Sequence, residues 1–279
     1  MIHIVYGCFY VGVLFHFMSS ERRFAAIQKW SRQALGMLNI RWKVNGALAP
    51  DALPTLVVSN HVSWLDIWVI NCVTPVRFVA KSDIRRWPVV GFLVTGAGTI
   101  FIEREKRRDT ARTNRAVIEA LMSGDYVAVF PEGTTTDGTE VKSYHASLFQ
   151  PALGAGARVV VLALRYLTPD GRVNISASYV GDQSLLESVR LILGQRSLDV
   201  EVIVAGTVDV SGKTRRQIAR EAEVATADAL SLPHPDKRPG TTADLLDAMP
   251  TTGDPTSSRN QAQSRSSESA SPVRTSDRR

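Results

Sequence analysis

The sequence predicts an α/β fold with a central, mostly parallel or mixed sheet flanked by helices. After residue 39, short apolar runs alternate with segments of helical periodicity. Many of these apolar runs are continuous, as expected for strands that helices cover on both faces. The 279 residues of the chain are enough to bury one sizeable core. These observations predict one main domain over residues 44–231.

The expected elements of this domain follow from the apolar runs and the helical periodicity between them. We expect strands at residues 55–60, 77–81, 99–104, 126–131, 159–166, 173–180 and 200–208. We expect helices at residues 64–72, 108–123, 185–193 and 214–229. The segment GTVDVSGKT resembles a phosphate-binding loop, but it has five residues between its glycines where that loop has four. We therefore interpret Ser211 and Gly212 as the cap of the last helix.

The first 43 residues predict two membrane-associating helices. Residues 2–18, IHIVYGCFYVGVLFHFM, contain no Lys, Arg, Asp or Glu and are slightly short for a spanning helix, which needs roughly 20 apolar residues. Residues 21–38 place apolar side chains at helical spacing among basic ones, which is typical of a helix in the headgroup layer. The alternatives stay open: the first helix spans or lies in the membrane, and the second packs on the core. The basic flank favours a location at the inner (cytoplasmic) membrane, with the main domain facing the cytoplasm.

The composition of the chain predicts a disordered tail and indicates which classes of partner to expect. From residue 232 the chain is rich in Pro, Ser, Thr, Gly, Asp and Arg, which predicts a disordered tail over residues 232–279. The net charge of +6 favours an anionic partner, either anionic lipid or a phosphorylated substrate. Nucleic acid is not expected, because no module signature or aromatic interleaving accompanies the basic residues. Cys8 and Cys72 lie in apolar runs, and we expect buried thiols there.

The segment VVSNHVSWLD combines a base with a carboxylate. A strand is expected to end at Asn60, His61 follows at once, and Asp66 lies near the start of the next helix. A His in the turn and an Asp in the first helical turn can meet. The carboxylate then fixes the imidazole tautomer and stabilises the imidazolium that forms when the base takes a proton. A structural His–Asp pair is the alternative on spacing alone.

Two later segments place polar groups at strand ends. In AGTIFIERE, Arg104 ends an apolar strand, where a guanidinium suits bidentate contact with phosphate or carboxylate. In VAVFPEGTTTDG, the residues Glu132, Gly133 and Thr134 form a tight turn after an apolar strand. Gly133 can expose backbone N–H groups to an anion there.

Taken in order, these segments resemble the blocks of the glycerolipid acyltransferases. The family patterns NHxxxxD, GxxFIxR and FPEGT are matched by His61 with Asp66, by residues 98–104 and by residues 130–134. The chain is most similar to bacterial 1-acylglycerol-3-phosphate acyltransferases over residues 56–166. The resemblance implies that residues 44–231 are an acyltransferase domain, which transfers a fatty acyl group to 1-acylglycerol-3-phosphate and gives phosphatidic acid.

The resemblance also implies roles for single residues. His61 acts as general base on the acceptor hydroxyl and Asp66 orients it, without an acyl-enzyme. Arg104 and the turn Glu132-Gly133-Thr134 hold the acceptor phosphate, and Lys81 is a further candidate for phosphate contact. The acyl donor is acyl-CoA or acyl carrier protein. No metal or cofactor is expected, and the expected partners are membrane lipids, a lysophospholipid and the donor.

One departure leaves alternatives for the acceptor. Many family members carry an Arg directly after the EGT, where this chain has Thr135. Enzymes that acylate lyso-ornithine lipid look similar around this block, so another lysolipid is the alternative acceptor. A serine hydrolase is not favoured, because no G-x-S-x-G occurs. A non-catalytic basic membrane-binding protein is the rival from a different class, and His61 discriminates because a binder has no use for that base.

Overall fold

The computed structural model describes residues 2–48, 54–102 and 107–235, all within one compact unit, Met1–Arg238. The described residues form a seven-stranded sheet in the order β1-β7-β6-β2-β5-β3-β4. Its strands are β1 (Ile40–Asn45), β2 (Thr55–Ser59), β3 (Arg77–Lys81), β4 (Ile100–Ile102), β5 (Tyr126–Val129), β6 (Arg158–Leu167) and β7 (Leu198–Val208).

The sheet is mixed, which is one of the two kinds of sheet that the sequence predicted. Strand β2 pairs in parallel with β5 and β6, and β3 pairs in parallel with β4 and β5. Strand β7 is antiparallel to β6, and β1 runs parallel to β7 at the edge. The carboxyl ends of β2, β3, β4, β5 and β6 therefore meet at one edge, which is where open α/β sheets bind ligands.

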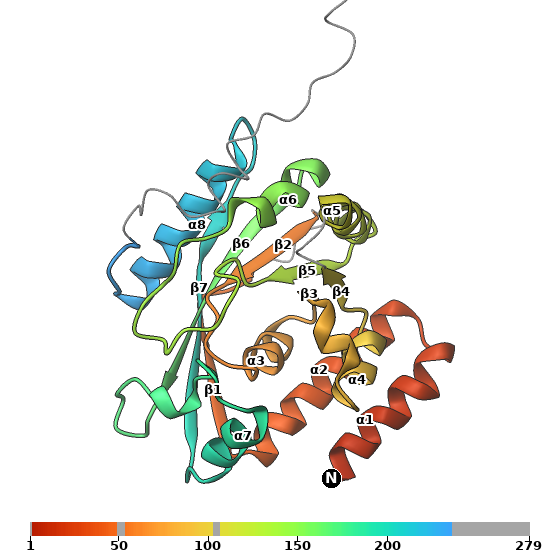
Figure 1. The fold of residues 1–279 in the computed structure, drawn as a ribbon, viewed down its shortest axis with the longest axis vertical. Helices are drawn as coiled ribbons and strands as arrows, with labels where there is room; N and C mark the ends of the chain where they lie inside the picture. Colours follow the sequence, from red (N-terminus) through yellow and green to blue (C-terminus); the bar gives the residue numbers. More distant parts are fainter. Residues whose placement is uncertain (1, 49–53, 103–106, 236–279) are drawn as a thin grey trace, which may run out of the picture. The chain divides into compact units, whose positions relative to one another are not determined.

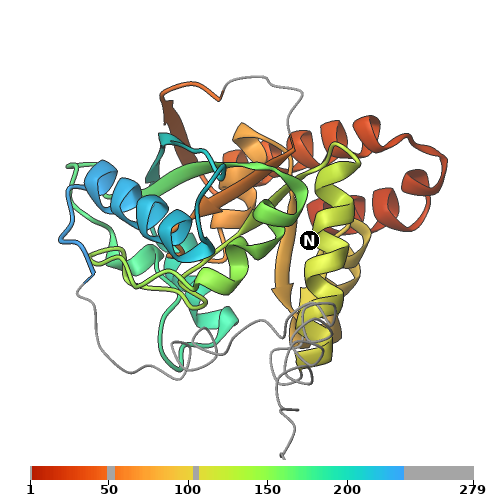
Figure 2. The same ribbon diagram turned by 90° about the horizontal axis from the view of Figure 1, so that it is seen from above.

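Helices cover both faces of the sheet (Figures 1 and 2). One face packs on α2 (Ser20–Met37), α3 (Asp66–Val73) and α7 (Leu185–Leu193) through a core that includes Leu35, Ile70, Ile192, Val57 and Leu162. The other packs on α5 (Arg107–Met122), α6 (Gln150–Ala155) and α8 (Arg215–Leu230), with Leu121, Ala152, Ile218, Leu56 and Val161 in its core. This burial on both faces explains the continuous apolar strands.

Both N-terminal helices pack on the rest of the domain, α1 (Ile2–Gly12) on α4 (Val90–Gly96) and α2 on α3. Helix α1 packs on α4 so closely that a Cβ on Gly96 would lie 2.0 Å from Cγ1 of Val11. The imidazole of His3 stacks on Trp30 of α2 with ring centroids 4.7 Å apart. Arg32 of α2 donates from Nη2 to the carbonyl of Cys72 in α3 at 2.9 Å. No helix of the described residues combines the length and the apolar character needed to cross a membrane.

Several expectations need correction. Residues 173–180 do not form a strand: polar residues break the apolar run, and a 3-10 helix, η4 (Ile175–Ala177), forms instead. The last helix is capped by Thr214, whose side chain accepts from Gln217 N–H, and not by Ser211 and Gly212. Cys72 is a buried free thiol, but Cys8 is only half-buried.

Other parts of the chain complete the description. Strand β1 was not expected, although its residues alternate between inward and outward positions. The remaining 3-10 helices are η1 (Leu14–Phe17), η2 (Ser82–Arg86) and η3 (Ala146–Phe149). The predicted strand at residues 99–104 is described only as far as Ile102. Most of the predicted tail, from residue 236 on, lies outside the described residues.

Candidate active site

The predicted site residues follow strands that end at the same edge of the sheet. His61 comes two residues after β2, and Glu132 comes three residues after β5. Lys81 is the last residue of β3, is exposed, and lies in register with Ile102 at the end of β4. Arg104 lies outside the described residues, two positions beyond Ile102. The fold thus gathers His61, Glu132 and Lys81 from three parallel strands at one edge.

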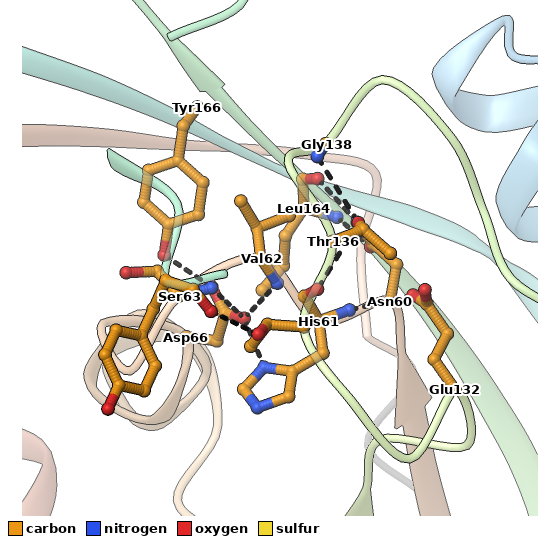
Figure 3. A network of polar contacts seen from close by, with 12 residues as sticks. Asn60, His61, Val62, Ser63, Asp66, Glu132, Thr136, Gly138, Leu164 and Tyr166 are labelled. Atoms are coloured by element: carbon orange, nitrogen blue, oxygen red, sulfur yellow. Dashed lines mark hydrogen bonds and ion pairs between the residues drawn. The ribbon is translucent and has the colours of Figure 1, made fainter. Parts of the chain in front are cut away.

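His61 and Asp66 meet as their spacing allows (Figure 3). His61 lies in the turn after β2, and Asp66 is the first residue of α3. Nδ1 of His61 is 2.7 Å from Oδ2 of Asp66. An ionised carboxylate can only accept a hydrogen bond, so the imidazole that pairs with it donates from Nδ1 and keeps Nε2 as its basic nitrogen. In Figure 3 the second ring nitrogen points away from the Asp66 carboxylate.

The carboxylate of Asp66 is buried and surrounded by donors. Its relative exposure is 0%. Besides the imidazole, Oδ2 accepts the backbone N–H groups of Val62 at 2.8 Å and Ser63 at 3.0 Å. Oδ1 accepts the hydroxyl of Tyr166, from strand β6, at 2.6 Å. Four hydrogen bonds to one carboxylate offset the cost of burying it.

The imidazole of His61 has a fixed orientation but is not sealed from solvent. Its ring stacks on Phe130, with centroids 3.9 Å apart and planes inclined by 9°. Phe130 in turn stacks on Phe78 of β3, at 5.8 Å. The side chain of His61 keeps 21% of its surface exposed. The ring is thus held by packing and by Asp66, while a substrate can still reach it.

The side chain of Asn60 fixes the end of strand β2. Its side chain donates from Nδ2 to the carbonyl of Leu164 at 3.0 Å and accepts the N–H of Leu164 at 2.8 Å. This pair of bonds continues the parallel ladder between β2 and β6 past Ser59, the last residue of β2. The Asn side chain therefore takes the place of a peptide group and fixes the point at which the chain leaves the sheet.

Glu132 lies inside the turn after β5, and its carboxylate does not face outward. The residue is 3% exposed, and its Oε1 accepts the N–H of His61 at 2.9 Å. Its Oε2 accepts the N–H of Lys142 at 3.2 Å. Burial raises the pKa of Glu132 to about 8, although the two backbone donors oppose the shift. In this structure, Glu132 supports the backbone of the base.

The residues after Glu132 form the outer part of the same turn. Gly133 has φ +71°, a conformation that favours glycine, and Thr134 is exposed beside it. Thr135 points its hydroxyl at the carbonyl of Tyr179 and donates to it. Tyr179 donates its N–H to the carbonyl of Val62 at 2.9 Å, so segment 177–181 is tied to both turns. The position after the EGT is thus occupied by a neutral side chain engaged within the protein.

Sequence reasoning missed the residues that complete the site from a distance. Tyr166, Asn60 and Phe130 act through contacts that their local sequence does not reveal. Asn60 and Phe130 lie within the matched blocks, and Tyr166 lies outside them, at the end of the similar stretch 56–166. Trp64 packs edge-on to Trp68 and donates to Oγ of Ser188 at 3.0 Å. Within the described residues, no cluster of three or more His, Cys, Asp or Glu residues is arranged to hold a metal ion.

Comparison with known proteins identifies the family of this chain. The sequence model of the Acyltransferase family matches residues 41–165. The 1-acyl-sn-glycerol-3-phosphate acyltransferase of Neisseria meningitidis is 36% identical over 201 residues, which cover 72% of this chain and 78% of that protein. The lyso-ornithine lipid O-acyltransferase of Pseudomonas aeruginosa is also 36% identical, over 202 residues that cover 72% of this chain and 76% of the relative.

A solved structure shares the fold. The crystal structure of the 1-acyl-sn-glycerophosphate acyltransferase PlsC from Thermotoga maritima matches with a TM-score of 0.59 and 21% identity, over 90% of this chain and 95% of that one. The chain therefore belongs to the acyltransferase family, as the resemblance predicted. It is an acyltransferase of lipid biosynthesis.

Proposed function

We propose that the enzyme transfers a fatty acyl group from a thioester donor to the free hydroxyl of 1-acylglycerol-3-phosphate and forms phosphatidic acid. The observation that carries this proposal is the His61–Asp66 pair, held at 2.7 Å with Nε2 left as the base. The neighbouring exposed Lys81 and the turn at Gly133 and Thr134 lie at the same sheet edge and suit an anionic headgroup. Relatives named for this activity support the acceptor.

The proposed reaction is direct. Nε2 of His61 takes the proton from the acceptor hydroxyl as its oxygen attacks the thioester carbonyl carbon. The tetrahedral intermediate collapses, the C–S bond breaks, and the leaving thiolate takes the proton back from the imidazolium. Asp66 stabilises the imidazolium between these two steps. The donor is acyl-CoA or acyl carrier protein, and the steps need no metal or prosthetic group.

Within this proposal, Arg104, Lys81, Gly133 and Thr134 bind the acceptor phosphate. Arg104 follows β4, which runs parallel to β3 and ends beside Lys81. Glu132 takes a supporting role, because its carboxylate is engaged by the backbone of His61 and Lys142. The sequence assigned phosphate binding to Glu132 together with Arg104. In this proposal Arg104 binds the phosphate, and Glu132 holds the turn.

A second acceptor, a lyso-ornithine lipid, is favoured by one observation. Thr135 follows the EGT directly, where many family members carry an Arg. Its hydroxyl donates to the carbonyl of Tyr179, so this position offers no cation to a headgroup. A headgroup without a phosphate needs fewer cations at this place. The lyso-ornithine lipid O-acyltransferase of Pseudomonas aeruginosa and the 1-acyl-sn-glycerol-3-phosphate acyltransferase of Neisseria meningitidis are both 36% identical to this chain.

We further propose that the enzyme works at the inner membrane, with its catalytic domain facing the cytoplasm. Helix α1 and the residues after it expose large apolar side chains, namely Ile4, Val5, Phe9, Val13 and Phe17. Arg22 and Lys29 on α2 are exposed as well. Apolar side chains next to cations suit the boundary between headgroups and acyl chains of an anionic membrane. The acceptor and the product are both lipids, which supports the same location.

An acyl-transfer assay on purified protein tests these proposals together. It offers labelled acyl-CoA and acyl carrier protein against lysophosphatidic acid and lyso-ornithine lipid, on anionic vesicles that are also sedimented to measure bound protein. His61→Ala should lower turnover by at least about 10²-fold with folding intact, because it removes the general base. Comparable turnover of the variant would refute the mechanism.

The other outcomes separate the remaining alternatives. Transfer to lyso-ornithine lipid alone would keep the mechanism and replace the acceptor. Protein that stays in the supernatant of the vesicles would contradict the membrane location. Vesicle binding without transfer to any acceptor, equal in wild type and variant, would favour a non-catalytic membrane-binding protein.

A further inference from the structure

Among the described residues that donate to the carboxylate of Asp66, Tyr166 is the one that lies outside the turn and helix of Asp66 itself. The three donors to Oδ2 all belong to residues 61–63. The phenol of Tyr166 instead comes from β6, 100 residues further along the chain, and donates to Oδ1 at 2.6 Å. This bond is short for an O–H donor, as expected when the acceptor is ionised. In Figure 3 the phenol points directly at the carboxylate.

The backbone holds Tyr166 firmly in this place. Strand β6 extends beyond β2, because Ser59 pairs with Leu162 and Asn60 brackets Leu164. Tyr166 follows Leu164 by two positions and therefore faces the same side of the sheet, toward α3. Its carbonyl also accepts the N–H of Asn174 at 2.9 Å. The direction of the phenol is thus set by the sheet.

The phenol is also suited to act as a permanent donor. Tyr166 is 2% exposed. Burial, together with the charge and the hydrogen bond of Asp66, raises the pKa of Tyr166 well above its ordinary value. The hydroxyl therefore keeps its proton at neutral pH, and its role toward the carboxylate is to donate.

We propose that Tyr166 is a positioning residue that sets the proton affinity of the His61–Asp66 pair and aims Oδ2 at the imidazole. This inference rests on the proposed function of His61 as the base. A donor on Oδ1 withdraws charge from the carboxylate and stops it from rotating. Without that donor the carboxylate keeps more of its negative charge and stabilises the imidazolium more strongly, so the imidazole binds a second proton, on Nε2, more tightly. The base would then be blocked by protonation at a higher pH.

Tyr144 provides a matched control. Its phenol is also buried and donates to Oγ1 of Thr226 at 2.8 Å. Tyr144 belongs to the core on the opposite face of the sheet from Asp66 and Tyr166. Tyr166→Phe and Tyr144→Phe therefore each remove one buried hydroxyl and its hydrogen bond and keep the ring. They differ in that one of these bonds ends on the carboxylate of Asp66.

The experiment measures two properties of the full chain, wild type and both variants. The first is the pH dependence of kcat/KM, whose acidic limb reports the protonation of the free base. The second is an NMR titration of the His61 imidazole, assigned by its loss in His61→Ala. For Tyr166→Phe we expect turnover to fall by about 10-fold to 100-fold, as for other partners that orient a functional imidazole. Both the acidic limb and the titration should move upward by about one pH unit.

The outcomes separate the two proposals. A shift in Tyr166→Phe with no shift in Tyr144→Phe supports the positioning role. Unchanged titration and pH profile in Tyr166→Phe, or equal shifts in both variants, would overturn it. If His61→Ala retained turnover, the proposed function of His61 would fail, and the NMR titration would still decide whether Tyr166 controls the pair.

Discussion

Asp66 and Glu132 are both buried carboxylates at the same edge of the sheet, but their partners differ. Asp66 accepts four hydrogen bonds, from two backbone N–H groups, one imidazole and one phenol. Glu132 accepts two from the described part of the chain, both from backbone N–H groups. Asp66 contacts the ring of His61, whereas Glu132 contacts the backbone of the same residue.

The difference shows how one site uses two acidic side chains for separate tasks. Side-chain donors compensate the buried Asp66 and connect it to the base. For Glu132 the cost of burial outweighs the help of its two donors, so its pKa is raised to about 8. Asp66 therefore acts on the imidazole of the base, and Glu132 shapes the turn that carries the base.

The largest effect is expected for Asp66→Asn, which removes the charge at almost constant shape. The amide cannot stabilise the imidazolium as the carboxylate does, and it can present a donor where Nδ1–H needs an acceptor. We expect turnover to fall by about 10³-fold to 10⁴-fold, the size seen when a comparable carboxylate is replaced in a catalytic triad. Steady-state kinetics measures this loss, and Glu132→Gln serves as the control with a much smaller one. Turnover within tenfold of wild type would show that the charge of Asp66 is not needed.

A smaller effect, on stability, is expected for Glu132. The folded protein holds this group at a pKa of about 8, and its ordinary value is 4.5. Between these values the folded state binds more protons than the unfolded state, so the unfolding free energy decreases as pH rises from about 4.5 to about 8. Each unit of difference in pKa corresponds to about 1.4 kcal/mol, which makes a total loss of a few kcal/mol.

Glu132→Gln should remove this dependence on pH. The amide is neutral at every pH, but its NH₂ must face the N–H of His61 or of Lys142, at a constant cost of about 1–3 kcal/mol. The variant should therefore be less stable than wild type at pH 5, the two curves should cross as pH rises, and the variant should be the more stable protein at pH 8. Denaturant unfolding at several pH values measures both curves. Parallel curves would show that Glu132 is ionised in the folded protein throughout.

The smallest effect is expected for Ser63→Ala. The backbone N–H of Ser63 donates to Asp66, but its buried Oγ has no hydrogen-bond partner among the described residues. Alanine keeps the N–H and removes an uncompensated hydroxyl. Turnover should stay within about twofold of wild type and the unfolding free energy within about 0.5 kcal/mol, as for substitutions that break no contact. A large loss of turnover at unchanged stability would assign the hydroxyl a part in the reaction.

The pattern of apolar and polar residues predicted β2 and α7 correctly, but it failed for β1 and for residues 173–180. The apolar run before Asn60 ends where β2 ends, and α7 spans Leu185–Leu193 as its periodicity predicted. Strand β1 was missed, because its six residues follow an amphipathic helix and continue its mixture of apolar and basic side chains. The predicted strand at residues 173–180 was wrong, because Asn174 and Ser178 interrupt the apolar residues there. The sequence of a short apolar run that polar residues interrupt does not determine whether the run forms a strand or a helix.

The site was predictable where its contacts are short in sequence. His61 and Asp66 are five residues apart, so spacing alone shows that they can meet. The inward direction of Glu132 depends on Lys142 and on the turn after β2, and the bond from Tyr166 depends on the register between β2 and β6. Register is a property of the assembled sheet, and one sequence does not reveal it. The phosphate-binding role of Arg104 stays a prediction, since Arg104 lies outside the described residues.

The long reach of β6 has a consequence for the order in which the enzyme is made. Asn60 and Asp66 take partners that lie 104 and 100 residues downstream. The ribosome therefore completes the NHxxxxD segment well before the strand that fixes it, and contacts between such distant segments form late in folding. A nascent chain that has not reached Tyr166 holds the base and its carboxylate without the phenol that orients them. We therefore expect a truncated chain that ends before β6 to lack acyltransferase activity, because it lacks the strand to which Asn60 and Asp66 bond.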